Sequence, residues 1–446
     1  MGVSTKAQPI ATAPTIWFEV EDLLRHFDGA EQPTGIPRVC LEIVKAAQAH
    51  YAARVRFCRL SRFSCRFEAV SFAELMALCS SSAYGGLPSG QRRGIGFREI
   101  RRGLRHFWRV ASAMLKDSIG YFVRRRANED LFSRGDILVE MGTGWVNSRY
   151  GATIATMKAR RGVRAATLVH DIIALTHPQY YYGRSNEKFS RWLKNVFYNA
   201  DLIFTSSAYC SGRLVEFGDR EGLRVPPIKT IPFGSAFTLA QSSAVPDAME
   251  WQGQFVLLVS TVEIRKNHLL MLHVWRRLIQ SHGADRVPNL IFAGRIGWRI
   301  EKLMTELNAT RFLDGKIIMA RNLSDFALDD AYQRALFTVF PSFCEGWGLP
   351  VSESLSHGTF CICSNATSLP EVGGDFVDYF DPTDEDQAFS AVERAIFDPE
   401  YLAGRKVDLR TRYRPRSWDA CVQRMIDGLS LLAGPSAPDS RSPRLP

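Results

Sequence analysis

Two glutamates with seven residues between them, Glu345 and Glu353, lie where the sequence predicts a strand, a loop and a helix. Phe337–Phe340 is a short run of apolar, β-branched and aromatic residues, which is typical of a buried strand. Pro350 suits the first turn of a helix, and Gly358 suits the position just after its end. We therefore place Glu345 in the loop and Glu353 in the first turn of the helix.

A loop of this kind is expected at the carboxyl edge of a parallel sheet, where open α/β sheets bind their ligands. The free N–H groups and the positive dipole end of the helix suit a phosphate. Carboxylates, which only accept hydrogen bonds, suit the hydroxyl groups of a sugar or a ribose. The residue types and their spacing therefore indicate a site for a ligand that carries both phosphate and hydroxyl groups.

Within EGWGLPVSESLSHG, the two glutamates resemble the E-x7-E signature of the retaining glycosyltransferases of family 4. STVEIRKN at Ser260–Asn267 and SNATSLPEVGGD, which ends at Asp375, are also similar to that family, and the three motifs occur in the family's order. The resemblance implies an α/β protein with the GT-B fold. In this fold, two Rossmann-like doubly wound domains face each other across a cleft, and a C-terminal crossover helix joins them again.

Arg265 and Lys266 follow the predicted strand Phe255–Ser260 and are expected at the carboxyl edge of the second sheet. Transfer from a nucleotide sugar expels a diphosphate, whose negative charge must be stabilised as it develops. The resemblance implies that these two cations do this, with a pair of surface cations as the alternative. Arg295, after the predicted strand Asn289–Ala293, is a further candidate. Because no Asp-x-Asp pair lies in a suitable loop, we expect a metal-independent reaction with no cofactor besides the nucleotide-sugar substrate.

By the same resemblance, Glu345 accepts hydrogen bonds from the sugar and helps to place its anomeric carbon, and Glu353 accepts from the ribose of the nucleotide. Gly346 and Gly348 let backbone N–H groups reach the sugar and the phosphate. Glu371, in LPEVGGD, is interpreted as a structural or nucleotide-side residue. The leaving phosphate itself is expected to deprotonate the acceptor on the same face, so no dedicated base is required.

In the first half of the chain, His170 and Asp171 end the predicted strand Arg164–His170. The family carries a similar pair that faces the donor sugar, which implies a catalytic role for His170; a structural histidine is the alternative. Asp171 is interpreted as a residue that orients or caps the loop. Gly35, in TGIPR, corresponds to the family's glycine-rich loop beside the donor diphosphate, or is a plain turn glycine. Arg38 either assists there or is a solvated helix residue.

The elements that must position these residues follow from the hydrophobic pattern. After residue 254, predicted strands and helices alternate, which is typical of a doubly wound parallel sheet. We predict an acceptor-side domain at 15–240, a linker at Leu239–Gly253 and a nucleotide-sugar-binding domain at 254–412. A crossover helix at 415–433 is expected to pack back on the first domain. No G-x-G-x-x-G follows the first strand of either half, so an NAD site is not expected.

The composition favours a folded protein without a membrane span. The 446 residues are 46% hydrophobic and 23% charged, which is typical of globular domains. No run of about 18 apolar residues is found, and the first residues lack the pattern of a secretory signal. The nine cysteines are scattered and odd in number, so we expect a reducing, cytoplasmic compartment rather than a disulfide framework.

The formal net charge of +10 is concentrated in one segment. Arg92–Arg126 holds ten Arg and one Lys against Glu99 and Asp117, a net charge of +9. Aromatic and aliphatic residues recur there at helical spacing, which predicts a basic amphipathic helix that contacts an anionic membrane surface. A surface helix packed on the domain is the alternative, and nucleic acid is not expected because no reader motif accompanies the charge. We expect a protein peripheral on the inner face of the cell membrane.

TGIPRV together with HDIIALTHPQYY resembles bacterial enzymes that build O-antigen and exopolysaccharide chains, many of which are mannosyltransferases. We therefore favour GDP-mannose as the donor and a polyprenyl-diphosphate-linked or oligosaccharide acceptor, with a UDP-linked hexose as the alternative donor. A catalytically silent GT-B module that binds glycans or scaffolds an assembly is a second hypothesis. A GT-B epimerase or hydrolase of nucleotide sugars is a third.

Overall fold

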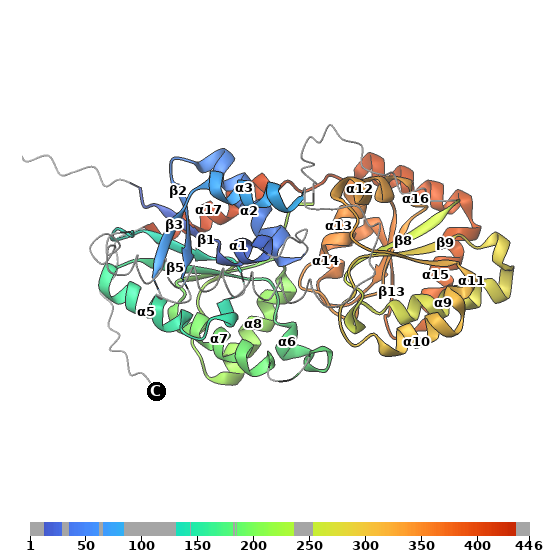
Figure 1. The fold of residues 1–446 in the computed structure, drawn as a ribbon, viewed down its shortest axis with the longest axis horizontal. Coiled ribbons are helices and arrows are strands. Elements are labelled where there is room, and N and C mark those ends of the chain that lie inside the picture. The colour runs from blue at the N-terminus through green and yellow to red at the C-terminus, as the bar shows by residue number, and fades with distance from the viewer. Residues whose placement is uncertain are drawn as a thin grey trace, which may run out of the picture.

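The computed structural model describes residues 13–28, 35–61, 66–83, 131–142, 144–181, 183, 185–235 and 253–433. Within these ranges the chain forms two α/β domains, which lie next to each other along the long axis of the molecule (Figure 1). The predicted basic helix at 92–126, nearly all of the predicted linker and both chain ends lie outside the described residues.

The first domain contains a seven-stranded sheet in the order β3-β2-β1-β4-β5-β6-β7. All neighbouring strands are parallel except β2 and β3, which pair antiparallel at one edge. The strand–helix rhythm of the sequence did not predict this antiparallel edge. The strands are β1 (Ile16–Glu19), β2 (Val55–Leu60), β3 (Phe67–Val70), β4 (Ile137–Glu140), β5 (Arg164–Val169), β6 (Leu202–Thr205) and β7 (Ile228–Thr230).

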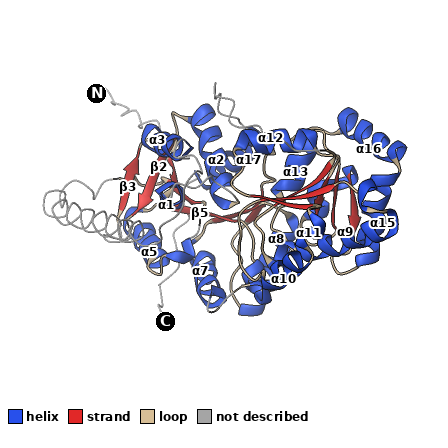
Figure 2. Cartoon of the chain, turned by 45° about the vertical axis from the view of Figure 1, so that its right-hand side comes forward, coloured by secondary structure: helices blue, strands red, loops and turns tan. Residues whose placement is uncertain are grey.

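Helices cover both faces of this sheet (Figure 2). Buried side chains of α1, α2 and α3 pack on one face, and those of α5, α6, α7 and α8 pack on the other. The helices are α1 (Glu21–Asp28), α2 (Ile36–Tyr51), α3 (Phe72–Ala83), α5 (Tyr150–Arg161), α6 (Ile173–Thr176), α7 (Ser185–Asn199) and α8 (Ala208–Glu221).

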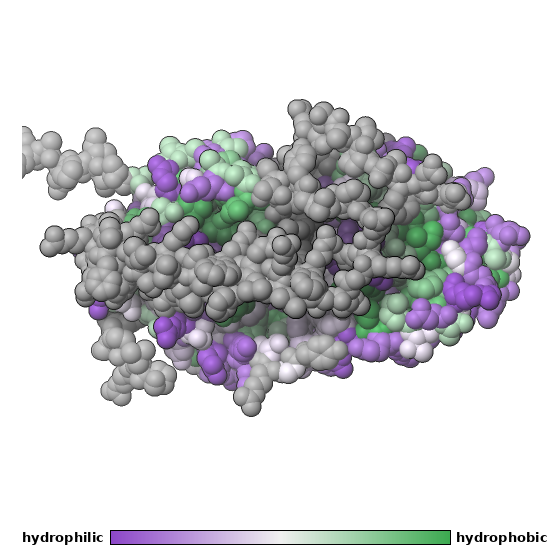
Figure 3. Space-filling view, viewed as in Figure 1, coloured by the Kyte–Doolittle hydropathy of each residue, from purple (hydrophilic) through white to green (hydrophobic). Residues whose placement is uncertain are grey.

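The second domain contains a six-stranded parallel sheet in the order β10-β9-β8-β11-β12-β13. Its strands are β8 (Phe255–Val259), β9 (Asn289–Ala293), β10 (Ile317–Ala320), β11 (Thr338–Phe340), β12 (Cys361–Ser364) and β13 (Val377–Phe380). The helices are α9 (His268–His282), α10 (Glu301–Ala309), α11 (Arg311–Asp314), α12 (Asp325–Arg334), α13 (Leu349–Ser356), α14 (Leu369–Gly373), α15 (Glu385–Phe397) and α16 (Pro399–Arg412). The surface at the outer end of this domain is largely hydrophilic (Figure 3).

The last helix, α17 (Trp418–Ser430), returns to the first domain and packs on α2 and β6. Ser417 caps it, since its hydroxyl accepts a hydrogen bond from the backbone N–H of Ala420 at 3.1 Å. The ring of Trp418 stacks on Phe233 with centroids 6.0 Å apart. The predicted fold, two doubly wound domains and a crossover helix, is therefore confirmed.

The position of Glu353 differs from the prediction. Helix α13 begins at Leu349, one residue before Pro350, because Gly348 adopts φ 108° and ψ 56° and ends the preceding loop. Glu353 is therefore in the second turn of the helix rather than the first. A glycine is required at the start of this helix because residues with a side chain rarely adopt such a positive φ.

Two buried glutamates face each other at the carboxyl edge of the first sheet. Glu19 of β1 and Glu140 of β4 are partners in the strand register, and they are 6% and 4% exposed. Burial raises the pKa of Glu19 to about 8, with a further contribution from Glu140, and burial raises the pKa of Glu140 to about 7. The indole N–H of Trp192 donates to Glu140 at 2.9 Å. At neutral pH this pair therefore retains protons that an unfolded chain would release.

This pair is expected to make the stability of the protein fall as the pH rises. The folded-state pKa values lie above the ordinary value of 4.5, so the stabilisation is complete below that value and is lost as the pH rises through 7 and 8. Each retained proton contributes a slope of about 1.4 kcal/mol per pH unit. A plot of the free energy of unfolding against pH, between pH 5 and 9, should therefore be flatter for Glu19→Gln than for the wild type. The control is Glu216→Gln, at an exposed site of α8. Parallel plots for the wild type and Glu19→Gln would contradict the expectation.

Candidate functional site

The candidate site lies where the strand order of the second sheet reverses. Strands β8 and β11 are neighbours there, although β9 and β10 lie between them in the sequence. The turn Ile264–Lys266 follows β8, and the loop 341–348 follows β11. The backbone N–H of Phe343 donates to the carbonyl of Arg265 at 2.9 Å and joins the two segments. Open α/β sheets bind ligands at such a switch point, outside the carboxyl ends of the strands.

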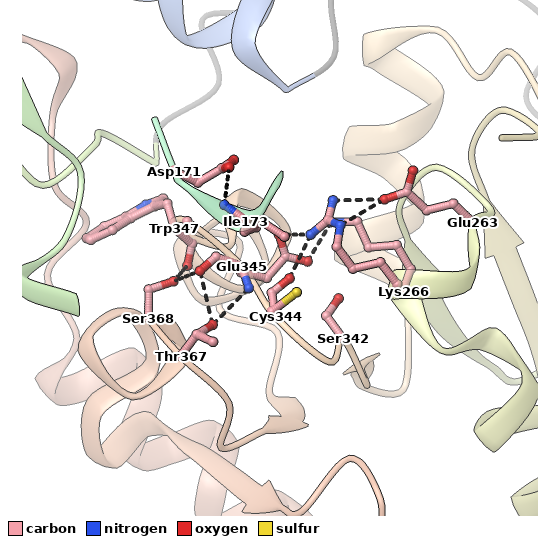
Figure 4. Close-up of polar contacts among 12 residues, drawn as sticks. Asp171, Ile173, Glu263, Lys266, Ser342, Cys344, Glu345, Trp347, Thr367 and Ser368 are labelled. Carbon is pink, nitrogen blue, oxygen red and sulfur yellow. Dashed lines mark hydrogen bonds and ion pairs between the residues drawn. The ribbon is translucent and has the colours of Figure 1, made fainter. Parts of the chain in front are cut away.

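Arg265, Lys266 and Glu345 come together at this point. Figure 4 shows Lys266 beside Glu345. The Arg265 guanidinium lies 2.9 Å from one carboxylate oxygen of Glu345, and the Lys266 ammonium lies 2.5 Å from the other. Arg265 also pairs with Glu263 at 2.8 Å and donates to the carbonyl of Cys344 at 2.7 Å. The Arg265, Lys266 and Glu345 side chains are 14%, 11% and 8% exposed, so this is a nearly buried cluster of charges.

The charges of this cluster shift one another's pKa values. Burial alone would raise the pKa of Glu345, but Arg265 and Lys266 outweigh it and lower this pKa to about 2. Burial and the neighbouring guanidinium lower the pKa of Lys266. Burial raises the pKa of Glu263, although Arg265 opposes this. Glu345 is thus ionised at neutral pH, between two cations.

The loop that carries Glu345 is held by two hydroxyl side chains of the segment before α14. The backbone N–H of Glu345 donates to the Thr367 hydroxyl at 2.8 Å. The Ser368 hydroxyl lies 2.9 Å from the carbonyl of Glu345 and 3.1 Å from that of Trp347. Figure 4 shows Glu345 between Lys266 on one side and Thr367 and Ser368 on the other. The sequence alone did not indicate these two supporting residues, because their contacts depend on how two loops meet.

His170 lies just after β5 and is 8% exposed. Its Nε2 is 2.6 Å from the carbonyl of Met141, and because a carbonyl only accepts, Nε2 carries the proton. Burial lowers the pKa of His170, so the ring is neutral near pH 7. Asp171 accepts from the backbone N–H of Ile173 at 2.9 Å and so caps the following turn, as its sequence position indicated.

The two glycines of the loop have different neighbours. A side-chain Cβ at Gly346 would lie 2.4 Å from the carbonyl oxygen of His170, so the first domain approaches the loop at this residue. The carbonyl of Gly346 accepts from the hydroxyls of Ser206 and Ser207 at 2.9 and 3.0 Å. A Cβ at Gly348 would lie 2.5 Å from Leu369. Gly346 therefore allows close contact between the domains in this structure.

Glu353 is buried in α13 and has partners from both domains. The Tyr332 hydroxyl donates to one carboxylate oxygen at 2.9 Å. Arg38, at the start of α2, lies 3.8 Å from the other oxygen and 3.8 Å from Asp325. No sequence pattern pointed to Tyr332, whereas the position of Arg38 beside the glycine of TGIPR was a partial signal. Arg38 is thus an ion-pair residue between the domains rather than a solvated one.

The structure places the two remaining predicted residues, Gly35 and Arg295, in loops. Gly35 precedes α2 with φ 60° and ψ −127°, a conformation that favours glycine. Arg295 is half-buried in the loop after β9, where its carbonyl accepts from the N–H of Val262 at 2.8 Å. Among the described residues, no three His, Cys, Asp or Glu side chains are grouped so as to hold a metal ion. Within the same residues, no helix is both long and apolar enough to cross a membrane.

Known proteins resemble this chain in sequence. Residues 250–412 match the family model described as "Glycosyl transferases group 1". The O-antigen chain mannosyltransferase B of Escherichia coli is 28% identical over 273 residues, which cover 60% of this chain and 71% of that protein. The serotype-specific mannosyltransferase WbdA of Escherichia coli is 27% identical over 277 residues, which cover 60% of this chain. The match covers 34% of WbdA, so it spans about a third of that protein's length.

Solved structures resemble the whole fold. Anabaena HepE, in complex with UDP and glucose, aligns with a TM-score of 0.58 and 14% identity over 94% of this chain and 100% of that one. The sucrose-phosphate synthase of Thermosynechococcus elongatus aligns with a TM-score of 0.57 and 14% identity over 94% of this chain and 99% of that one. The predicted GT-B fold is confirmed by these likenesses. With the family match over the second domain and the relatives above, they identify this chain as a glycosyltransferase with the GT-B fold.

Proposed function

We propose that this glycosyltransferase belongs to family 4 and transfers mannose from GDP-mannose, with retention of configuration, onto a lipid-linked or growing polysaccharide acceptor. The observation that carries the reaction is the buried cluster of Arg265, Lys266 and Glu345 at the switch point of the second sheet. The choice of mannose rests on the relatives, since both are named as mannosyltransferases and one as an O-antigen chain enzyme.

In the proposed mechanism, Arg265 and Lys266 stabilise the diphosphate as it leaves. Both cations are nearly buried and already oriented by Glu345 and Glu263, so little reorganisation is needed when negative charge develops. Because the pKa of Glu345 is about 2, this residue stays ionised and accepts hydrogen bonds from the sugar hydroxyls. Such a carboxylate is too weak a base for the acceptor proton, so the leaving phosphate takes that proton.

His170 would act from the first domain as a neutral hydrogen-bonding residue. Its pKa is lowered by burial, and its Nε2 proton is held by the Met141 carbonyl. The other ring nitrogen, Nδ1, is therefore left as an acceptor. A hydroxyl group of the donor sugar could donate to it. This role needs the first domain to lie against the donor loop, as it does at Gly346.

Glu353 would hold the ribose of the nucleotide. Tyr332 fixes one carboxylate oxygen at 2.9 Å, whereas Arg38 contacts the other at 3.8 Å. A long ion pair is weaker than a direct hydrogen bond, so a ribose hydroxyl can replace Arg38 at this oxygen. Arg38 would then be released close to Gly35, where the diphosphate is expected.

We further propose that the basic segment 92–126 brings the protein to an anionic surface on the inner face of the cell membrane. Its net charge of +9 and its aromatic residues at helical spacing support this. Sedimentation with vesicles of anionic lipid, compared with neutral vesicles, tests the proposal. Equal sedimentation with both would contradict it.

A UDP-hexose is the second candidate donor. It is favoured by the likeness to HepE, whose structures hold UDP with glucose or UDP-glucose. A silent module has less support because Arg265, Lys266, Glu345 and Glu353 are all present, and the first three are gathered in one cluster.

Nucleotides are expected to stabilise the folded protein in a way that identifies the donor. At a concentration a hundredfold above its Kd, a ligand adds about 2.7 kcal/mol, which corresponds to a rise in Tm of roughly 5 °C. We expect this rise with GDP and GDP-mannose, and we expect Glu353→Ala to lose more than half of it. Glu400→Ala, at an exposed site of α16, should keep the full shift. The measurement is thermal unfolding with a panel of GDP, UDP and their hexose conjugates.

The other outcomes of this panel are equally informative. A rise with UDP compounds alone would keep the reaction and overturn GDP-mannose. A rise that Glu353→Ala leaves unchanged would remove this residue from the nucleotide site. The absence of any rise, on a sample with cooperative unfolding, would contradict a glycosyl-transfer function and favour the silent module.

A further inference from the structure

The segment before and within α14 contacts both the donor loop and the first domain. Its hydroxyl residues Thr367 and Ser368 hold the backbone of Glu345. Three residues later, the carboxylate of Glu371 reaches helix α8 of the first domain. We propose that Glu371 is a positioning residue, which docks the Glu345 loop on α8 and so sets how the donor site meets the acceptor-side domain.

The Glu371 contact is specific in its geometry. One carboxylate oxygen accepts from the backbone N–H of Ala208 and the other from that of Tyr209, both at 2.7 Å. These are N–H groups of the first turn of α8, which have no partner within the helix. The next N–H, of Cys210, is satisfied by the Ser207 hydroxyl at 3.2 Å. The carboxylate also lies at the positive end of the helix dipole, so charge and hydrogen bonding act together.

A second contact between the domains lies beside the first. The Gly346 carbonyl accepts from the hydroxyls of Ser206 and Ser207, which immediately precede α8. The Cα of Gly346 lies against the backbone of His170. The loop that carries Glu345 and the segment that carries Glu371 are thus both held at the N-terminal end of α8.

The two contacts differ in their exposure to solvent, which decides their roles. The Gly346 contact is buried, whereas Glu371 is exposed at the surface. Water can replace the partners of an exposed carboxylate, so the Glu371 contact can open and close without a large loss of free energy. Separation of the domains must break both contacts. The strength of the Glu371 contact therefore contributes to the fraction of molecules in which the Glu345 loop lies against the first domain.

The substitution Glu371→Gln weakens this contact with little change in shape. A glutamine has one acceptor oxygen, and its NH₂ group would face the second N–H of α8 as donor against donor. The equilibrium constant between the joined and the separated domains is expected to fall by roughly tenfold, the size of effect typical of hydrogen bonds to a charged group. Glu216→Gln removes a carboxylate from α8 away from the docked end and is the matched control.

The distance between the domains gives a test that needs no donor. Spin labels at Tyr198→Cys on α7 and Val407→Cys on α16 are both well placed, since the side chains they replace are 66% and 61% exposed. Pulsed electron paramagnetic resonance should show one main distance between the labels for the labelled parent protein and for Glu216→Gln. For Glu371→Gln it should show additional, longer distances. Ser206→Ala should give a smaller change of the same kind, and it replaces Glu371→Gln if that variant does not fold.

Kinetics then separate positioning from ligand binding. This part rests on the proposed function: turnover of the nucleotide sugar should fall in Glu371→Gln, by up to about tenfold, while the KM for the nucleotide sugar and the affinity for the free nucleotide stay within a factor of two. Unchanged distances and unchanged turnover would overturn the proposal. Equal losses of affinity and turnover would also overturn it, because Glu371 would then be a ligand. A wild-type protein that turns over no nucleotide sugar would contradict the proposed function alone, and the distances would still decide the role of Glu371.

Discussion

Glu345→Gln is expected to lower the turnover of the nucleotide sugar by about a hundredfold or more, while the KM for the donor changes only a few-fold. The carboxylate accepts from the donor sugar in the proposed mechanism, and it also orients the Arg265 and Lys266 side chains. A glutamine keeps the shape but turns a fixed negative charge into a dipole, so both cations lose their common partner. The measurement is steady-state turnover with the donor that the nucleotide panel identifies.

The same substitution is expected to destabilise the second domain. Removing one member of a buried ion pair typically costs about 3–5 kcal/mol, because the remaining charge stays buried without a partner. Lys266 would be this charge, since Arg265 keeps Glu263. The double variant Glu345→Gln with Lys266→Met should therefore recover part of the lost Tm and none of the turnover. Recovery of both would show that the cluster acts only through stability.

The low pKa of Glu345 also makes its contribution to the stability of the protein depend on pH. Because this pKa is about 2 in the folded protein and near 4.5 ordinarily, the contribution is complete above pH 4.5 and is lost as the pH falls toward 2. The wild type should therefore lose stability relative to Glu345→Gln in acid. If the two proteins lost stability equally in acid, the ion pair would not be formed in the folded protein in solution.

Gly346→Ala is expected to reduce turnover about as strongly by a different route. The added Cβ would lie 2.4 Å from the carbonyl oxygen of His170 and 2.7 Å from the Cβ of Asp171. A backbone carbonyl cannot rotate away as a flexible side chain can, so the domains must separate at this contact. Positioning errors of about 1 Å near the chemistry can lower rates by about a hundredfold.

Nucleotide binding should survive in Gly346→Ala, because Glu353 and the two cations belong to the second domain. Thermal shifts with nucleotides therefore serve as the check that this domain is intact. Gly404→Ala is the matched control, since Gly404 lies within α16 with no atom close to the added Cβ. Wild-type turnover in Gly346→Ala would mean that the reaction proceeds with the two domains apart.

The parts of the site that lie within one domain could be predicted from the sequence. Arg265 and Lys266 follow one strand and Glu345 another, and the parallel topology brings the ends of both strands to one edge. The strand Asn289–Ala293 was predicted with the bounds that the structure has. These predictions depend on periodicity and turn residues, which are local properties of the chain.

The contacts between the domains could not be predicted in this way. Arg38 pairs with Glu353, and Glu371 caps α8, through pairs of residues that are far apart in the sequence. Their side chains carry no periodic signal, and their meeting depends on the relative placement of two independent sheets. The antiparallel edge strand β3 was also missed, because its sequence FEAV contains a charged residue and an alanine and forms no continuous apolar run.

The return of α17 to the first domain has a consequence for the biosynthesis of the protein. Trp418, Val422, Met425, Ile426 and Leu429 belong to the buried core of that domain, together with residues of β1 and α2. The ribosome makes β1 and α2 first, the entire second sheet next, and α17 only afterwards. The nascent first domain therefore exposes an apolar face until the second domain has been synthesised. The delay makes the final docking of α17 a late step in folding.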